Sequence, residues 1–236
     1  MSDDIASYAG KLGMQIKRRN VLVEGTSDVA LIHLVGQLEK QRSGLDFLED
    51  LAFLAAGERE QGGVDGLLRE LITFRSLGRN VMDANGKQIY RFVGLFDNDH
   101  AGRRAIATAK SVGGLLEYRD VFRLMPIMPL PGNLDQKTVE AAFKKNNESY
   151  RGMDWEIEDL ISEELALAFI EEFGGAVKTN IAKADKTHRE FTKDGKAKFH
   201  RYIKENAIRQ DLEEVLKLIS ALRYYFNLPI PNSHHT

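Results

Sequence analysis

Two short apolar runs in the chain each end in acidic residues, and this pattern restricts the possible folds more than any other feature. Residues 21–23 are followed by Glu24 and a glycine, and residues 92–96 are followed by Asp97 and Asp99. Short apolar runs bounded by turn residues are typical of buried strands in a parallel sheet. The carboxyl ends of parallel strands meet at one edge of the sheet, where open α/β folds place their functional sites. We therefore expect Glu24, Asp97 and Asp99 to lie together at that edge.

Strand-like and helix-like patterns alternate along the first half of the chain. Four apolar runs have the length of strands: 20–23, 51–56, 89–96 and 121–125. The segments between them have helical periodicity: 29–38, 64–77 and 101–112. This alternation predicts an α/β fold with a mostly parallel sheet and helices on both faces. Thr26 or Ser27 is expected to cap the first of these helices.

The second half of the chain has a different character. Prolines break the apolar run at 127–130, and residues 132–152 read as a polar loop with one helix near 138–143. Three further segments are distinguished by charge or periodicity: an acidic amphipathic helix at 163–173, a basic stretch at 178–204 and a terminal helix at 209–225. We expect three parts in all: a helical lead-in at 1–19, an α/β core at 20–131, and a C-terminal part at 132–236. A flexible loop is expected at 57–63 and a disordered tail at 232–236.

Composition excludes several classes of protein. The chain has 236 residues, a net charge of −2 and no cysteine. Without cysteine it forms no disulfides and no cysteine-ligated zinc ribbons. A net charge so close to zero gives no general attraction to nucleic acid, so any such binding must come from local basic patches. No apolar run approaches the length of a membrane span, and the N-terminus is acidic, so we expect neither a membrane anchor nor a signal peptide and place the protein in the cytoplasm.

The three acids at the expected sheet edge suggest a divalent metal site. An Asp-x-Asp sequence by itself is weak evidence, because aspartate is common in turns. Here the preceding strand is almost entirely apolar, which fixes its end, and Glu24 occupies the same position on another strand. Carboxylates gathered at one edge repel each other, and a cation relieves the repulsion. Oxygen donors of this kind suit Mg²⁺ or Mn²⁺.

The same motifs carry a resemblance to a known superfamily. Val21-Leu-Val-Glu-Gly-Thr-Ser-Asp28, together with Gly94-Leu-Phe-Asp-Asn-Asp-His-Ala-Gly102, resembles the toprim superfamily over at least residues 20–130. That superfamily includes type IA topoisomerases, primases, recombination mediators and the overcoming-lysogenization-defect (OLD) nucleases. The resemblance implies a Rossmann-like sheet with Glu24, Asp97 and Asp99 in a metal-dependent site.

Within the superfamily, the chain is most similar to the toprim domain of the OLD nucleases. Primases and recombination mediators with zinc modules need cysteines, and topoisomerases need large additional domains and a nucleophilic tyrosine. Asp28, four residues after Glu24, matches the Glu-x-x-x-Asp pattern of the OLD group. In that group a later acidic pair and a lysine complete a two-metal site. The matching residues here are Glu156, Glu158 and Lys196, with Lys198 nearly as good a match as Lys196.

The acidic pair Glu156 and Glu158 and the basic stretch also have simpler structural interpretations. If Glu156 and Glu158 lie on a strand, their side chains point to one side; alternatively they open the acidic helix, where the helix dipole favours acids. The basic stretch is either a solvated face or a groove for a phosphate backbone. In the second case, the residues expected to contact nucleic acid are Arg103, Arg104, Lys193, Lys198 and Arg201. His100 is expected to be a surface histidine.

The resemblance implies a Mg²⁺- or Mn²⁺-dependent nuclease that cuts DNA or RNA by a two-metal mechanism. In this mechanism Glu24 and Lys196 are catalytic. The two ions are held by six acids: Glu24, Asp28, Asp97, Asp99, Glu156 and Glu158. OLD nucleases carry an ATPase domain, and this sequence has no Gly-x-x-x-x-Gly-Lys-Ser/Thr loop. A separate ATPase subunit is therefore expected, as in two-component phage-defence systems, and oligomers are compatible with it. The alternatives are a nucleic-acid-binding or regulatory subunit that does not cleave, and a nucleotidyl transferase of the primase type.

Overall fold

The computed structural model describes residues 4–56 and 62–231. Most of the loop expected at 57–63, and the whole of the tail expected at 232–236, lie outside these residues. None of the helices in the described ranges is long and apolar enough to cross a lipid bilayer.

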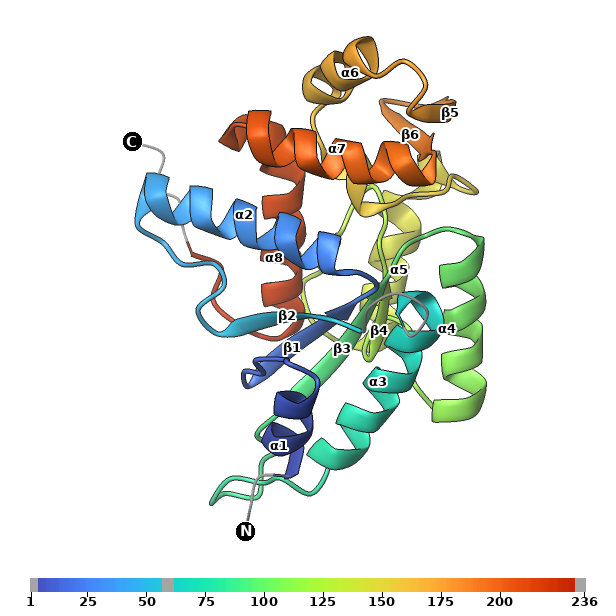
Figure 1. The fold of residues 1–236 in the computed structure, drawn as a ribbon. Helices are drawn as coiled ribbons and strands as arrows, with labels where there is room; N and C mark the ends of the chain where they lie inside the picture. The colour runs from blue at the N-terminus through green and yellow to red at the C-terminus, as the bar shows by residue number, and fades with distance from the viewer. Residues whose placement is uncertain (1–3, 57–61, 232–236) are drawn as a thin grey trace.

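A four-stranded parallel sheet forms the centre of the molecule (Figure 1). Its strands run in the order β2-β1-β3-β4. Their bounds are β1 (Arg19–Val23), β2 (Leu51–Ala55), β3 (Arg91–Phe96) and β4 (Val121–Arg123). All three neighbouring pairs are parallel, and Leu22 of β1 lies opposite Gly94 of β3. The predicted α/β class is confirmed, and the two strands that end in acids are neighbours.

Helices cover both faces of the sheet and make three layers (Figure 1). One face carries α2 (Thr26–Ser43) and α8 (Glu213–Tyr225), and the other carries α1 (Asp4–Lys11), α3 (Gly63–Gly78) and α4 (His100–Gly113). Successive strand residues point to opposite faces. Val21 and Val93 accordingly belong to one buried cluster, whereas Leu22 and Phe92 belong to the other. Burial on both faces explains why these strands are continuous apolar runs.

Glycine in the middle of β3 allows α3 to lie close to the sheet. A Cβ atom built on Gly94 would be 3.0 Å from side-chain carbons of Leu67 and Leu71, both on α3. A larger residue would therefore push the helix away or bend the strand that leads to Asp97. The close packing of α3 fixes β3 up to its last residue.

The C-terminal part contains more regular structure than the sequence patterns predicted. It consists of α5 (Gln136–Asn146), the 3₁₀ turns η2 (Glu148–Tyr150), η3 (Ile157–Leu160) and η4 (Arg209–Leu212), α6 (Glu163–Glu172), the hairpin β5 (Val177–Lys183) with β6 (Lys186–Phe191), and α7 (Lys193–Asn206). The basic stretch at 178–204 is thus an antiparallel hairpin followed by a helix. Residues 127–130, by contrast, form no strand, because the prolines around them lack the amide hydrogen that a sheet needs.

The C-terminal part shares its core with the sheet. A single buried cluster includes Val21 of β1, Trp155, Phe199 of α7 and Ile219 of α8. Figure 1 shows α6, α7 and the hairpin above the edge at which β1 and β3 end. The apolar core therefore holds the second half of the chain over the expected site.

Candidate metal centre

Glu24 and Asp97 meet where two neighbouring strands end. Glu24 follows β1 directly, and Asp97 follows β3. The Asp97 backbone N–H donates a hydrogen bond of 3.4 Å to Glu24 Oε1. The pairing of β1 with β3 thus brings together two acids that are more than seventy residues apart in the chain.

Asp99 caps helix α4 and fixes the loop after β3. Its Oδ1 accepts a hydrogen bond of 2.7 Å from the Gly102 N–H. The loop packs tightly on the first turn of the helix, since a Cβ atom on Gly102 would be only 2.0 Å from the Asp97 carbonyl oxygen. Gly102 is therefore required by the geometry of the Asp-x-Asp loop.

Asp28 lies in the first turn of α2 and faces the same edge. The residue that caps α2 is Gly25, so the prediction of Thr26 or Ser27 was wrong. Glycine has no side chain with which to cap the helix. Instead, the Asp28 side chain reaches back to the cap residue, and its Oδ2 accepts a hydrogen bond of 3.0 Å from the Gly25 N–H. This contact orients the Asp28 carboxylate, which is only 9% exposed.

Asn98, between the two aspartates, connects the loop to the second half of the chain. Its backbone N–H donates to the Trp155 carbonyl at 2.8 Å, and the Trp155 N–H donates to the Asn98 carbonyl at 3.3 Å. Its side-chain amide also donates to the Met153 carbonyl at 2.8 Å. Arg103 adds a hydrogen bond to the Asn98 carbonyl and an ion pair of 2.7 Å with Asp154. The sequence motifs gave no indication of this role for Asn98.

This connection places Glu156 and Glu158 beside the strand ends. Both proposed backbone settings for the pair were wrong: they lie neither on a strand nor at the start of the acidic helix. Glu156 caps the 3₁₀ turn η3, in which Glu158 lies, whereas α6 begins only at Glu163. Trp155 and Ile157 are buried in the core, and the Glu158 side chain is only 1% exposed.

Lys196 of α7 contacts both of these acids. Its Nζ is 3.0 Å from Glu156 Oε2 and 3.0 Å from Glu158 Oε2. The contact with Glu158 is an ion pair without hydrogen-bond alignment. Lys198 instead pairs with Asp194 on the surface, at 2.7 Å. Of the two lysines that the sequence offered, the structure brings Lys196 to the acids.

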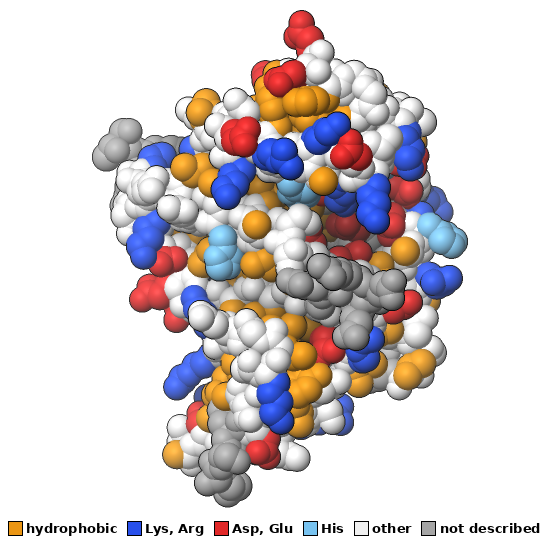
Figure 2. Space-filling view, viewed as in Figure 1, with side chains coloured by type: hydrophobic (Ala, Val, Ile, Leu, Met, Phe, Trp, Pro, Cys, Tyr) orange, Lys and Arg blue, Asp and Glu red, His pale blue; other side chains and the backbone are white. Residues whose placement is uncertain are grey.

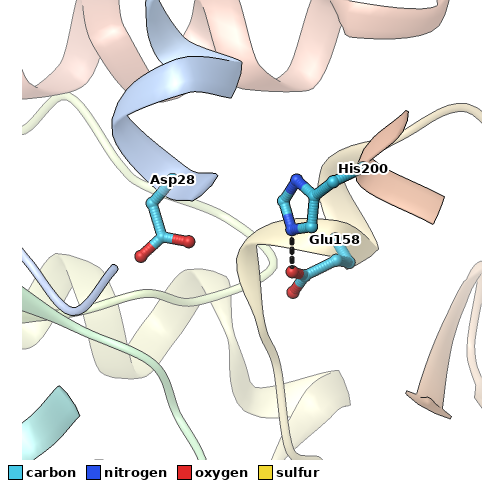
Figure 3. A group of neighbouring side chains, drawn as sticks. All are labelled: Asp28, Glu158 and His200. Atoms are coloured by element: carbon cyan, nitrogen blue, oxygen red, sulfur yellow. Dashed lines mark hydrogen bonds and ion pairs between the residues drawn. The ribbon is translucent and has the colours of Figure 1, made fainter. Parts of the chain in front are cut away.

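His200 belongs to the cluster as well, although the sequence motifs did not single it out. Its Nε2 is 2.5 Å from Glu158 Oε1. Ligand atoms of Asp28, Glu158 and His200 all lie within 4.8 Å of one another (Figure 3). The available signal was the spacing of Lys196 and His200, which at four residues lie on one face of a helix.

The acids at the strand ends are held in a strongly unfavourable environment. Burial, together with the charges of Asp99 and Asp28, raises the pKa of Glu24 to about 7. Burial and the charge of Glu24 raise the pKa of Asp97 well above its usual value. Burial and the charge of Glu158 raise the pKa of Asp28. Raised pKa values of this kind among buried acids are typical of functional sites.

Glu158 differs from these acids because Lys196 and His200 contact it. Burial alone would raise its pKa, but the hydrogen bond with His200 and the charge of Lys196 lower the pKa to about 2. The pKa of Lys196 is raised in turn, since the attraction of Glu158, Asp97 and Glu156 outweighs its burial. Figure 2 shows a recess in which acidic side chains gather beneath lysines and arginines. One lysine does not balance so many acids, and the donor set fits divalent cations.

The remaining predicted site residues lie outside this cluster. The Arg103 guanidinium is held by Asp154 and the Asn98 carbonyl. Four further residues are exposed on α4 or α7: Arg104, Lys193, Lys198 and Arg201. His100 is also exposed, at the start of α4.

Comparisons of the chain with protein-family models, curated proteins and solved structures found no match. The relation to the toprim superfamily is therefore a resemblance carried by the two sequence motifs.

Proposed function

We propose that the protein is a nuclease that uses divalent metal ions to hydrolyse phosphodiester bonds in DNA or RNA. The observation that carries the proposal is the convergence of six acids and one lysine at the carboxyl edge of a parallel sheet. The acids are Glu24, Asp28, Asp97, Asp99, Glu156 and Glu158. So many carboxylates would repel a phosphate, and divalent cations reverse that repulsion.

Five of the acids divide into two groups that could each hold an ion, and Glu156 pairs with Lys196 beside them. Glu24, Asp97 and Asp99 follow the strand ends, whereas Asp28 and Glu158 lie on the side nearer α7. Two ions bound there would supply an activated water and stabilise the leaving oxygen. The protein's own contribution is to fix the carboxylates through the hydrogen bonds of the Asp-x-Asp loop and the α2 cap.

Lys196 supplies a cation that is present without metal. Ion pairs with Glu156 and Glu158 hold its ammonium group against the acids. A phosphoryl group bound beside them would place its developing negative charge near this ammonium, which would stabilise the transition state. A lysine that stabilises a transition state must be in position before the reaction begins. The two ion pairs hold the Lys196 ammonium group in that position.

A basic pocket next to the Asp-x-Asp loop supports a nucleic-acid substrate. It has a volume of about 630 Å³, and Asn98 forms part of its wall. Four cationic side chains line it, Arg103, Arg123, Lys144 and Arg151, together with one acid, Glu148. The first three also form ion pairs with acids on their own or neighbouring elements. Its lining also includes the partly exposed ring of Tyr118. Cationic groups beside an aromatic ring suit a strand of phosphates and bases.

The pocket predicts a specific effect on binding. Changing both Lys144→Ala and Arg151→Ala should weaken the binding of a labelled single-stranded oligonucleotide about tenfold at low salt. It should also reduce the slope of log K against log salt by about 1 to 2, because two phosphate contacts are lost. Fluorescence anisotropy in EDTA measures both quantities without cleavage.

The matched control removes the same charge at the opposite edge of the sheet, by Arg79→Ala with Lys87→Ala. Both of these residues are exposed, near the start of β3. The control should bind like the wild type. An equal loss of affinity in the two double variants, or no loss in either, would contradict a role for the pocket.

The proposed activity is tested by incubating supercoiled plasmid and total tRNA with the protein and Mg²⁺ or Mn²⁺. We expect metal-dependent cleavage of at least one substrate by the wild type, and none by the Glu24→Gln, Asp97→Asn double variant. A control with Glu49→Gln and Asp50→Asn, two exposed acids before β2, should cut normally. Cleavage that persists in the site variant would refute the proposal.

The second candidate is a subunit that binds nucleic acid without cutting it. The same basic pocket favours it, since the pocket explains binding but not hydrolysis. Tight, metal-stimulated binding by the wild type without any product would select this function. Any ATPase that accompanies the nuclease would be supplied from outside residues 1–236, and an increase in cleavage on adding it would identify it.

A further inference from the structure

Three side chains from three different elements converge on one side of the acid cluster. Asp28 comes from α2, Glu158 from η3 and His200 from α7. Figure 3 shows the Asp28 carboxylate facing Glu158 and the His200 ring across a short gap. Their ligand atoms lie within 4.8 Å of one another, so small movements would bring all three onto one ion.

Glu158 places a buried carboxylate in this group. Its side chain is 1% exposed, and its Oε2 atom accepts no aligned hydrogen bond. A buried carboxylate oxygen without such a bond is costly unless a charge compensates it. Lys196 supplies that charge from one side, at 3.0 Å. An ion on the other side would contact Glu158 together with Asp28 and His200, whose ligand atoms lie within 4.8 Å of one another.

His200 gives this side of the centre a different chemistry from the other. Glu24, Asp97 and Asp99 offer only oxygen atoms, whereas His200 offers an imidazole nitrogen, Nε2, which hydrogen-bonds Glu158 at 2.5 Å and would lose its proton on binding an ion. Oxygen donors suit both Mg²⁺ and Mn²⁺, whereas an imidazole nitrogen binds transition ions, of which Mn²⁺ is the weakest binder, more readily than it binds Mg²⁺. The resemblance described above involves carboxylates and a lysine, so a nitrogen ligand is not part of it.

The surroundings of His200 hold its ring in place. The ring lines a groove of about 300 Å³ between α2 and α7, beside Leu31, Leu34 and Ile203. Ser27, His33, Gln37 and Lys204 add polar groups to the lining. The ring is therefore fixed by packing on one side and directed at two carboxylates on the other.

We propose that Asp28, Glu158 and His200 form a binding site for a divalent transition ion, with His200 as a nitrogen ligand that makes the site prefer Mn²⁺ to Mg²⁺. The proposal refines the proposed nuclease function by naming the class of ion at one of its two positions. Metal binding itself does not require that the protein cleave nucleic acid.

The test measures the metal alone, bound to the full chain without nucleic acid. Calorimetry with MnCl₂ and MgCl₂ gives the two affinities, and electron spin-echo spectroscopy of bound Mn²⁺ detects a coordinated nitrogen. We expect a ¹⁴N coupling in the wild type and its loss in His200→Asn. This variant should also bind Mn²⁺ at least about tenfold more weakly, with a smaller effect on Mg²⁺.

His33→Asn is the matched control, because His33 is an exposed histidine that lines the same groove from α2. It should retain the ¹⁴N coupling and both affinities. If wild-type protein loaded with Mn²⁺ shows no ¹⁴N coupling, or if His200→Asn weakens Mn²⁺ and Mg²⁺ equally, His200 only positions Glu158 and the proposal is wrong.

The outcome is independent of the test for nuclease activity. A ¹⁴N coupling in a protein that cuts no substrate would support this metal site and refute the nuclease. Cleavage by a protein without the coupling would support the nuclease and refute the nitrogen ligand.

Discussion

Lys196→Met is expected to reduce the single-turnover rate of cleavage by about 10²–10³-fold. Lys196 is the cation that lies 3.0 Å from both Glu156 and Glu158. Methionine keeps a side chain of similar length but removes the charge that would stabilise the phosphoryl group in the transition state. The rate is measured with protein in excess over a labelled substrate, at saturating Mn²⁺.

The control for this prediction is Lys198→Met, two residues along the same helix. Lys198 pairs with Asp194 on the surface, so its loss should leave the rate within about twofold of the wild type. The binding of Mn²⁺ to Lys196→Met should be unchanged or tighter, because a competing cation is gone. If both variants cut normally, or if Lys196→Met fails only because it no longer binds metal, the catalytic role of Lys196 is wrong.

The largest expected effect on stability comes from Glu24→Gln. In the metal-free protein at pH 8, we expect this change to increase the free energy of unfolding by up to about 3 kcal/mol. Burial and the neighbouring acids raise the pKa of Glu24 to about 7, from an ordinary value of 4.5. An ionised Glu24 therefore destabilises the fold, and glutamine removes the charge while keeping the shape.

The dependence on pH follows from the direction of this shift. The pKa is higher in the folded than in the unfolded state, so protonated Glu24 stabilises the fold fully below pH 4.5. That contribution is lost as the pH rises towards 7. The advantage of Glu24→Gln over the wild type should thus be small at pH 4.5, grow up to about pH 7 and then level off. Urea unfolding in EDTA across this range measures it.

Glu39→Gln provides the opposite case. Burial alone would raise the pKa of Glu39, but hydrogen bonds from Arg42 and Arg209 lower it. Removing this carboxylate should destabilise the protein at pH 8.

Adding Mn²⁺ should stabilise the wild type more than Glu24→Gln, since ligands stabilise the state that binds them. A loss of stability in metal-free Glu24→Gln would show that Glu24 is a structural acid.

The sequence determined the α/β fold and the first half of the site. Apolar runs with helical segments between them admit few topologies, and parallel strands place their ends at one edge. Glu24 and Asp97 follow directly from this rule, because each comes immediately after a strand. Asp28 is one helical turn beyond Glu24, so its position depends only on local structure as well.

Only the tertiary structure decided the second half of the site. Glu156 and Glu158 reach the strand ends through the hydrogen bonds between Asn98 and Trp155, and no local pattern encodes that pairing. The hairpin before α7 was missed because the residues of β5 are mostly exposed and polar, so they lack the alternation of a half-buried strand.

The tertiary structure was also needed to choose between Lys196 and Lys198. Both lie in one short basic segment, and their types and spacing to other motifs are nearly equal. The helix separates them, because residues two apart point in different directions and residues four apart share a face. Phe199, buried in the core, sets the rotation of α7. That rotation directs Lys196 and His200 at Glu158 and leaves Lys198 on the surface, which a linear pattern of charges does not specify.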